Sequence, residues 1–393
     1  MVDLFGEPLI EEKEEVVDEP EIVEIANQAQ ASSANEDEHA PAANRKLVGH
    51  DELIQQLDTA YQEGRFPHAL LLTGPKGIGK ATLAYRIARY LLAQESEREE
   101  GLKTSQSSSV FRAVLTGAHP DLFIAQPGFD DKKGIQKRSL DADTIRKIAP
   151  FMRLRSSRSN GWRVVIVDEA HTMTTQAQNG ILKILEEPPK NAVLIIVSTT
   201  LGSLLPTIKS RVQHFPMTAL NKQDMEHCIT SQFDDVYETM HGDDVDILTY
   251  LAEGSPGQVL ELLRSDGLKL FLNVTELLNQ YPNFSAEDIR SFSYDLMRNN
   301  KNNVSNFTLF SSYLLWILKV LLLEKSCQNE TAFPILLARN NFVKHLLSED
   351  VQAEQIISIY DDISALLLKT ERQYLDKENA LIQTMQKLKT VGS

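Results

Sequence analysis

Residues 69–82 read ALLLTGPKGIGKAT, which is an apolar run, a glycine-rich loop and the start of a helical pattern. Gly74 to Lys80 fit the phosphate-binding loop G-x-x-x-x-G-K, in which backbone N–H groups and a lysine surround a phosphate. The next position normally carries Ser or Thr, whose hydroxyl binds Mg²⁺, but here it is Ala81. The stretch therefore predicts a strand–loop–helix unit for phosphate that lacks one metal ligand.

The loop supplies the first group of candidate nucleotide-binding residues. Three glycines let the backbone curl around one anion, the lysine reaches the β- and γ-phosphates, and the dipole of the following helix favours negative charge. Thr82 follows one residue too late to replace the missing hydroxyl without a shift of register. The candidates are Gly74, Gly77, Gly79, Lys80 and Thr82. The alternative interpretation is a glycine-rich turn that binds nothing.

Three further apolar runs predict buried strands: DLFIA (121–125), WRVVIVD (162–168) and AVLIIVST (192–199). Near-continuous apolar strands are typical of a parallel sheet that is covered on both faces. Amphipathic helical patterns, DADTIRKIAPFM (141–152) and TTQAQNGILKILEE (174–187), alternate with them. The alternation predicts a doubly wound α/β domain over residues 45–217, with the polar stretch 97–110 as a surface insertion.

The two ends of the chain differ from this domain. Residues 1–44 carry thirteen acidic residues against one lysine, and they hold most of the formal net charge of −15. Such a composition predicts an acidic disordered tail. After Pro216 the patterns are helical, first in a small region, 218–268, and then in longer helices over 269–393. We therefore expect two helical domains after the α/β domain.

The composition also limits the cellular compartments in which the protein is expected. Cys228 and Cys327 are too few and too far apart for a disulfide framework or a zinc site, and the acidic amino terminus does not resemble a signal peptide. The most apolar run, YLLWILKVLLL (313–323), is interrupted by Lys319 and is too short to span a bilayer. We expect a buried helix there and a cytoplasmic protein without a membrane partner.

A second motif, VVIVDEAH, places two acids directly after a predicted strand. Asp168 is expected to contact Mg²⁺ directly or through water when a nucleotide is bound. Glu169 would polarise the attacking water, as a general base that is vestigial if hydrolysis has been lost. The pair could instead be a solvated strand end, but it follows a phosphate loop in chain order, which favours the metal and water site.

The segments GPKGIGKAT, VVIVDEAH, NGILKILEEPP, STT and LLPTIKSR, in this order and spacing, resemble AAA+ ATPases of the clamp-loader group. GAHPDLF, EGSPGQVLEL and YLDKENAL extend the resemblance over about residues 45–390, towards the bacterial DNA polymerase III complex. The resemblance implies a P-loop AAA+ domain with a parallel sheet (45–217), a helical lid domain (218–268) and an all-α collar domain for oligomerisation (269–393).

The resemblance also implies roles for single residues. Thr199 matches the sensor position that responds to the γ-phosphate, and 48–50 resembles the segment that lines the adenine pocket. Ser210 and Arg211 match the Ser-Arg motif whose arginine enters the ATP site of a neighbouring subunit, so Arg211 would be catalytic in trans. Lys183 matches a basic residue at the same interface, and a lysine at the rim of the core is an equal interpretation.

Departures from the family pattern distinguish a motor subunit, which hydrolyses ATP itself, from a stator subunit, which hydrolyses little or none. Ala81 replaces the Mg²⁺ ligand, Gly257 stands where motor subunits keep a sensor arginine, and Val212 replaces the cysteine of the motif. The four cysteines of the zinc module in many relatives are missing, so zinc is not expected. Together these predict weak binding of ATP or ADP with Mg²⁺, and little or no hydrolysis by the chain itself.

The resulting hypothesis is a stator subunit of a clamp loader in DNA replication. It would supply Arg211 to an adjacent ATPase subunit of gamma/tau type, assemble with a delta-type subunit, and act on the sliding clamp and primer-template DNA through the complex. Two alternatives remain: an active AAA+ motor, and a structural interaction protein with a relic site. A basic cluster, Arg153, Arg155 and Arg158, predicts either sequence-independent phosphate contacts with DNA or a solvated loop.

Overall fold

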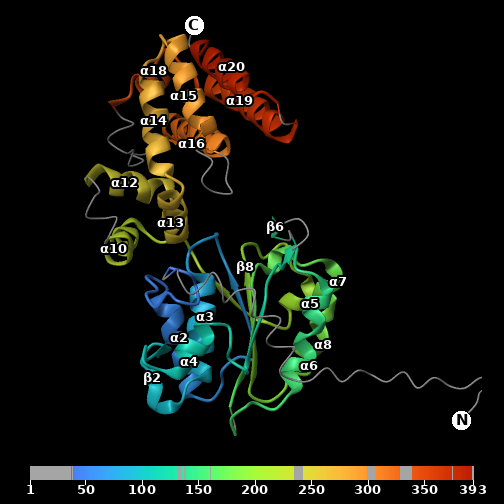
Figure 1. Cartoon of the computed structure of the whole chain (residues 1–393). Coiled ribbons are helices and arrows are strands. Elements are labelled where there is room, and N and C mark those ends of the chain that lie inside the picture. Colours follow the sequence, from blue (N-terminus) through green and yellow to red (C-terminus); the bar gives the residue numbers. More distant parts are fainter. Residues whose placement is uncertain are drawn as a thin grey trace, which may run out of the picture. The chain divides into compact units, whose positions relative to one another are not determined.

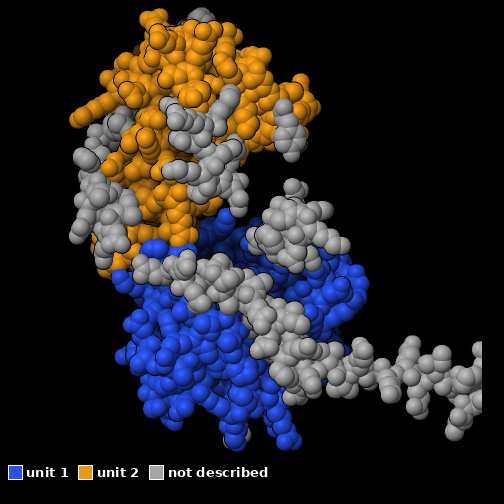
Figure 2. All heavy atoms as spheres, in the orientation of Figure 1, with its two compact units in different colours: residues 1–219 blue, residues 220–393 orange. Residues whose placement is uncertain are grey.

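The computed structural model forms two compact units, Met1–Ala219 and Leu220–Ser393, each described here by itself (Figures 1 and 2). The structure describes residues 37, 39–130, 135–136, 139–159, 161–233, 242–298, 306–327, 339–373 and 375–391.

A five-stranded parallel sheet forms the centre of the first unit, in the order β4-β7-β8-β1-β9. Its strands are β1 (Ala69–Thr73), β4 (Leu122–Ala125), β7 (Arg163–Val167), β8 (Ala192–Ser198) and β9 (Gln213–Pro216). In the register, Thr73 lies opposite Ser198, and Val167 lies opposite Ile196. All five strands therefore end at the same edge of the sheet, where ligands bind in open α/β sheets.

Both faces of the sheet are buried because successive side chains of each strand enter different cores. Leu70 and Leu72 pack in the core beneath helix α3, whereas Leu71 packs in the core beneath helices α5 to α9. Helices α2, α3 and α4 cover one face in Figure 1, and α5, α6, α7 and α8 cover the other. The architecture is the doubly wound α/β fold with a parallel sheet that the sequence predicts.

The helices and small hairpins of this unit have the following bounds: α2 Asp51–Gln62, α3 Lys80–Leu92, α4 Ser109–Leu115, α5 Ala142–Arg146, α6 Ile148–Arg153, α7 Thr175–Gly180, α8 Leu182–Glu186 and α9 Pro206–Lys209, with hairpins β2 (Arg98–Glu99) to β3 (Lys103–Thr104) and β5 (Phe129–Asp130) to β6 (Ile135–Gln136). The short 3-10 turns are Glu95–Glu97 and Ala170–Thr172.

Each predicted helix between the strands is divided in two. The pattern 141–152 forms α5 and α6, separated at Lys147, and the pattern 174–187 forms α7 and α8, separated at Ile181. Pro150 explains the first division, because it lacks the N–H that would continue the hydrogen bonds of α5, yet fits the first turn of a new helix. Gly180, a poor helix former, directly precedes the second.

Two sequence expectations for the first unit need correction. The stretch 97–110 is not simply a surface insertion, because Leu102 is fully buried and Thr104, Ser108 and Val110 are also buried. The ordered domain begins before residue 45, because Arg89 donates hydrogen bonds to Ala42 O (2.5 Å) and Asn44 O (3.2 Å), and Ala42 itself is buried. The rest of the predicted tail, apart from residue 37 and residues 39–44, lies outside the described residues.

The described elements of the second unit are all helices: α10 Lys222–Gln232, α12 Gly242–Leu251, α13 Pro256–Arg264, α14 Gly267–Asn279, α15 Ala286–Arg298, α16 Asn306–Cys327, α18 Asn341–Leu347, α19 Ala353–Gln373 and α20 Lys377–Lys389. The unit begins two residues after the boundary that the sequence predicts at 217. The predicted division at 268 stays a prediction, and it falls in the first turn of α14.

Helix α16 corrects the argument made for the apolar run 313–323. The helix is 22 residues long, twice the length of the run, so shortness does not exclude a membrane span, and α16 meets the length and apolarity of one. One face of the helix is nevertheless fully buried, with Phe310, Leu314 and Ile317 inaccessible to solvent. This burial is typical of a core helix that packs on the neighbouring helices of its unit.

Candidate nucleotide site and interface arginine

The phosphate loop connects β1 to α3 through three glycines with positive φ angles: Gly74 (147°), Gly77 (80°) and Gly79 (100°). The space at Gly74 is as restrictive as its backbone angle, because a Cβ there would lie 2.1 Å from Met217 O. A Cβ at Gly79 would lie 2.5 Å from Leu47 Cδ1. The loop therefore needs glycine at these positions for its own conformation, and its N–H groups lead into the amino end of α3.

Lys80, the first residue of α3, is buried against its own loop. Its ammonium donates hydrogen bonds to Gly74 O (2.7 Å) and Pro75 O (2.5 Å). Burial lowers the pKa of Lys80 to about 8, although the negative charge of Asp168 opposes the shift. The lysine is thus held over the loop by carbonyl oxygens, and it has to exchange these partners to contact a phosphate.

Asp168 and Thr199 are brought to the loop by the order of the strands. They follow β7 and β8, which are neighbours of each other, and β8 lies directly beside β1. Asp168 Oδ1 accepts a hydrogen bond from Glu169 N (2.8 Å), and burial raises the pKa of the Asp168 carboxyl group. Glu169 is exposed and has a left-handed backbone (φ 49°). Thr199 is partly buried at the same edge.

These residues fit a nucleotide better than they fit a tightly held metal. The glycine cradle and Lys80 suit a phosphate chain, and Asp168 suits a Mg²⁺ ion that takes its other ligands from phosphate and water. Ala81 presents only a methyl group, and Thr82 is buried within α3, the next residue along the helix. His50 Nε2 lies 3.1 Å from Ile78 O, which joins the segment 48–50 to the phosphate loop.

Arg211 lies near the amino-terminal ends of the strands, opposite to the carboxyl-terminal ends where the phosphate loop lies. It precedes β9, which is parallel to β1 and ends beside the phosphate loop, where Met217 N donates to Thr73 O (2.7 Å). The four residues of β9 at about 3.3 Å each place roughly 13 Å of strand between the two edges. The arginine is therefore separated from the phosphate loop of its own chain by the length of the strand.

The guanidinium group of Arg211 contacts three groups on two helices. Nη1 donates to Thr207 O (2.9 Å) and to Ser210 Oγ (3.2 Å), and Nη2 forms an ion pair with Glu186 Oε1 (2.9 Å). The Arg211 side chain retains 36% of its exposure. Lys183 is exposed one turn before Glu186 on α8, so Lys183, Ser210 and Arg211 lie near the same end of the strands. Their shared role at an interface stays a prediction.

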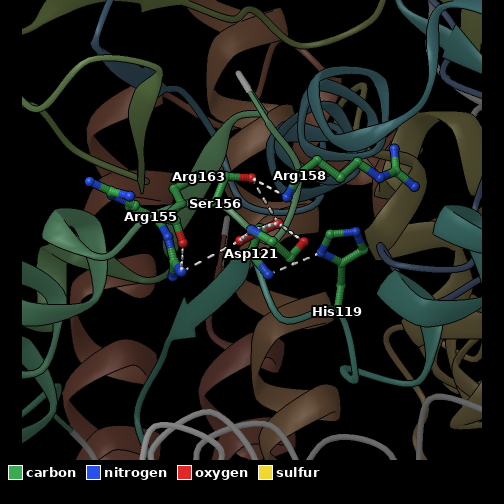
Figure 3. A network of polar contacts seen from close by, with 7 residues as sticks. His119, Asp121, Arg155, Ser156, Arg158 and Arg163 are labelled. Atoms are coloured by element: carbon green, nitrogen blue, oxygen red, sulfur yellow. Dashed lines mark hydrogen bonds and ion pairs between the residues drawn. The ribbon is translucent and has the colours of Figure 1, made fainter.

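The basic cluster is held by a buried carboxylate (Figure 3). Asp121 accepts hydrogen bonds from Ser156 Oγ (3.0 Å), Ser157 N (3.0 Å) and Ser157 Oγ, and lies 3.6 Å from Arg163 Nη2. Arg163 also donates to Arg155 O (2.5 Å). Arg158 donates to Leu92 O (3.0 Å), which caps the last turn of α3.

The three arginines of the predicted cluster therefore have different surroundings. The side chains of Arg153 and Arg155 are exposed, whereas Arg158 is partly buried and contacts α3 of its own chain. Among the described residues, no group of three or more His, Cys, Asp and Glu side chains is arranged to hold a metal ion.

The sequence interpretation missed two groups at these sites. Glu186 belongs to the NGILKILEEPP segment, but its pairing with Arg211 joins residues 25 positions apart in the chain. Asp121 lies in GAHPDLF, yet its partners come from the loop that contains the basic cluster. A single carboxylate before a strand gives no signal of its own, because only the pairing of β4 with β7 brings it close to Arg163.

Known proteins match this chain over much of the first unit. Residues 49–221 match the family model described as "DNA polymerase III, delta subunit". Subunit delta' of Escherichia coli (strain K12) DNA polymerase III is 31% identical over 214 residues, which cover 54% of this chain and 59% of the relative. The gamma/tau subunit of Mycobacterium tuberculosis (strain H37Rv) is 30% identical over 190 residues, 48% of this chain and 30% of the relative.

A further relative is subunit delta' of Pseudomonas aeruginosa, 35% identical over 144 residues, 37% of this chain and 41% of the relative. A solved gamma subunit-related protein of Thermotoga maritima aligns with 87% of this chain and 98% of its own, with 17% identity and a TM-score of 0.37. The chain thus spans 30% to 59% of the length of these curated relatives. Over residues 49–221, the chain is thus similar to the family of DNA polymerase III delta subunits, and the relatives that it matches include delta' subunits.

Proposed function

We propose that the chain acts as a stator subunit of a clamp loader in the bacterial cytoplasm. It presents Arg211 to the ATP site of an adjacent gamma/tau-type subunit, so that ATP hydrolysis there is coupled to loading of the sliding clamp on primed DNA. A delta-type subunit is its other partner. The chain itself hydrolyses little or no ATP.

The position of Arg211 is the observation that carries this proposal. A partly exposed guanidinium lies at the edge of the sheet opposite to the phosphate loop, where it can serve a neighbour's nucleotide. An arginine supplied in trans accelerates NTP hydrolysis by about 10³- to 10⁵-fold. The absence of a hydroxyl at Ala81 and of an arginine at Gly257 supports the loss of hydrolysis within the chain.

The experiment replaces Arg211 in the assembled complex. Arg211→Ala should leave assembly intact and reduce the ATPase rate that the clamp and primed DNA stimulate. Lys209→Ala removes a cation from α9 two residues earlier and serves as the matched control. A stimulated rate that is unchanged by Arg211→Ala would refute the stator role.

An active motor is the second candidate, because the fold brings Lys80 and Asp168 to one edge of the sheet, with Glu169 beside them. In that case, Mg²⁺ would be bound by Asp168 and would neutralise the charge that develops on the phosphates, and Glu169 would orient water. The isolated chain would then hydrolyse ATP, and Lys80→Ala would abolish that activity. We instead expect that the chain binds ATP or ADP weakly, as labelled nucleotide would detect, and does not hydrolyse it. A structural interaction protein with a relic site would bind no nucleotide even at millimolar concentration.

Arg153 and Arg155 are proposed as sequence-independent contacts to DNA phosphates within the complex, because both side chains are exposed. Arg153 ends α6, and Arg155 lies in the following loop, which Asp121 anchors through Ser157. Binding through them should weaken with salt for every DNA sequence alike. Arg153→Ala with Arg155→Ala should reduce the salt dependence of DNA binding by the complex. Equal salt dependence in the double variant and the native complex would exclude the contact.

A further inference from the structure

Glu186 contacts the proposed trans-acting arginine within the same chain. Its carboxylate lies 2.9 Å from Arg211 Nη2, while Thr207 O and Ser210 Oγ accept from Nη1 on the other side of the group. The contacts come from two helices, because Glu186 is the last residue of α8, whereas Thr207 belongs to α9. The guanidinium plane is therefore defined by groups on both helices.

These contacts leave donors for a second anion. A guanidinium group has five N–H donors, and the three contacts engage at most three of them. The Arg211 and Glu186 side chains retain 36% and 50% of their exposure, so the pair is open to an approaching phosphate. Glu186 thus orients the group without covering it.

Orientation before binding has a direct physical value. A free arginine side chain loses much rotamer freedom when it is fixed, and this loss opposes every contact that it makes on association. In this chain the ordering has already occurred within the subunit. The neighbour's nucleotide meets a guanidinium group that is held in one plane.

We propose that Glu186 is a positioning residue for Arg211: it fixes the guanidinium group in the orientation that reaches the γ-phosphate bound by the adjacent subunit. This inference rests on the proposed function, and it adds a residue that acts only through Arg211. Because the ion pair is half exposed, it contributes little to folding, and its removal should change the catalytic rate of the complex rather than the stability of the chain.

The matched control is the next residue. Glu187 is exposed, carries the same charge and follows the end of α8, but the contacts of Arg211 are made by Glu186. Glu186→Gln and Glu187→Gln therefore remove one negative charge each from adjacent positions. Glu186→Asp keeps the carboxylate on a side chain shorter by one methylene group, and it tests whether the charge can recover the effect.

The experiment measures ATPase activity of the complex reconstituted with its gamma/tau-type and delta-type subunits, sliding clamp and primed DNA. Glu186→Gln should lower the stimulated kcat by a factor of about 1.4 to 5, the range that an exposed ion pair contributes, with KM for ATP unchanged. Glu186→Asp should recover part of the rate, and Glu187→Gln should equal the native complex. Melting curves of the isolated chains should coincide.

Arg211→Ala, assayed in parallel, separates the two proposals. If Arg211→Ala leaves the rate unchanged, the stator function itself is wrong. If Arg211→Ala lowers the rate but Glu186→Gln does not, the stator function stands and the positioning role of Glu186 is refuted. A change in KM alone, or an equal loss in Glu187→Gln, would also refute it.

Discussion

Replacement of Asp121 by Ala should destabilise the first unit strongly. The carboxylate is buried, with 3% of its side chain exposed, and the guanidinium group of Arg163 beside it is 10% exposed. The substitution removes the acceptor for Ser156, Ser157 and Arg163 together. Removal of one partner of a buried ion pair costs about 3 to 5 kcal/mol, because the remaining charge is left without compensation.

The assay is urea unfolding followed by the fluorescence of Trp162, which directly precedes Arg163. Trp316, the second of the two tryptophans, lies in the other unit and is replaced by Phe in all variants. Asp143→Ala is the matched control, since Asp143 pairs with Arg146 on the surface, where both side chains are largely exposed. That control should cost less than about 1 kcal/mol.

A double variant tests the coupling directly. Asp121→Ala combined with Arg163→Met removes both charges, so it should cost less than the sum of the two single substitutions, by about 0.5 to 3 kcal/mol. A loss below about 1 kcal/mol for Asp121→Ala, or simple additivity in the double variant, would show that the network does not hold the loop.

Three further predictions concern the same unit. Gly74→Ala should abolish nucleotide binding and lower the melting temperature, because its Cβ would meet Met217 O. Gly64→Ala, where φ is also positive (69°) and the Cβ has open space, should keep binding; a titration with fluorescent ATP checks both. Ala81→Thr should increase the dependence of ATP binding on Mg²⁺ by supplying the missing hydroxyl, and equal affinity with and without Mg²⁺ would contradict this. Burial lowers the pKa of His119 from its usual value near 6.5, so below that pH the unfolded state binds more protons than the folded state. The free energy of unfolding should therefore fall with decreasing pH, with a contribution from His119 of at most about 1.4 kcal/mol per pH unit. His119→Gln should remove this contribution in unfolding curves between pH 7 and 5.

The strands of the sheet differ in how well the sequence predicts them, and burial explains the difference. Runs such as ALLLT and RVVIV are buried at every position, so apolar residues occupy both faces and the pattern is unmistakable. Strand β9, QHFP, was not predicted because it lies at the edge of the sheet and only Phe215 is buried. The hairpin around Leu102 was hidden by the polar residues on either side of one buried leucine.

The candidate site was predictable where the chemistry depends on a local motif. Gly74 to Gly79 form one continuous loop between β1 and Lys80, the first residue of α3, and Asp168 follows directly after a strand. Glu186 and Asp121 were missed because their partners are distant in sequence and are brought near only by the packing of α8 on α9 and of β4 beside β7. A motif defines residue types, whereas these pairs depend on tertiary structure.

The separation of Arg211 from the phosphate loop also limits how such subunits can associate. If Arg211 serves a neighbour's nucleotide, as proposed, a chain with its phosphate loop and this arginine at opposite ends of the strands would form head-to-tail contacts. Two copies related by a two-fold axis would then not serve each other's nucleotides through the same surface. A series of such contacts has two different ends. A subunit at one end would supply its arginine to a neighbour, while no neighbour would supply an arginine to its own phosphate loop. Hydrolysis at that loop would then not be needed, and the Mg²⁺-binding hydroxyl that Ala81 lacks would have no function there.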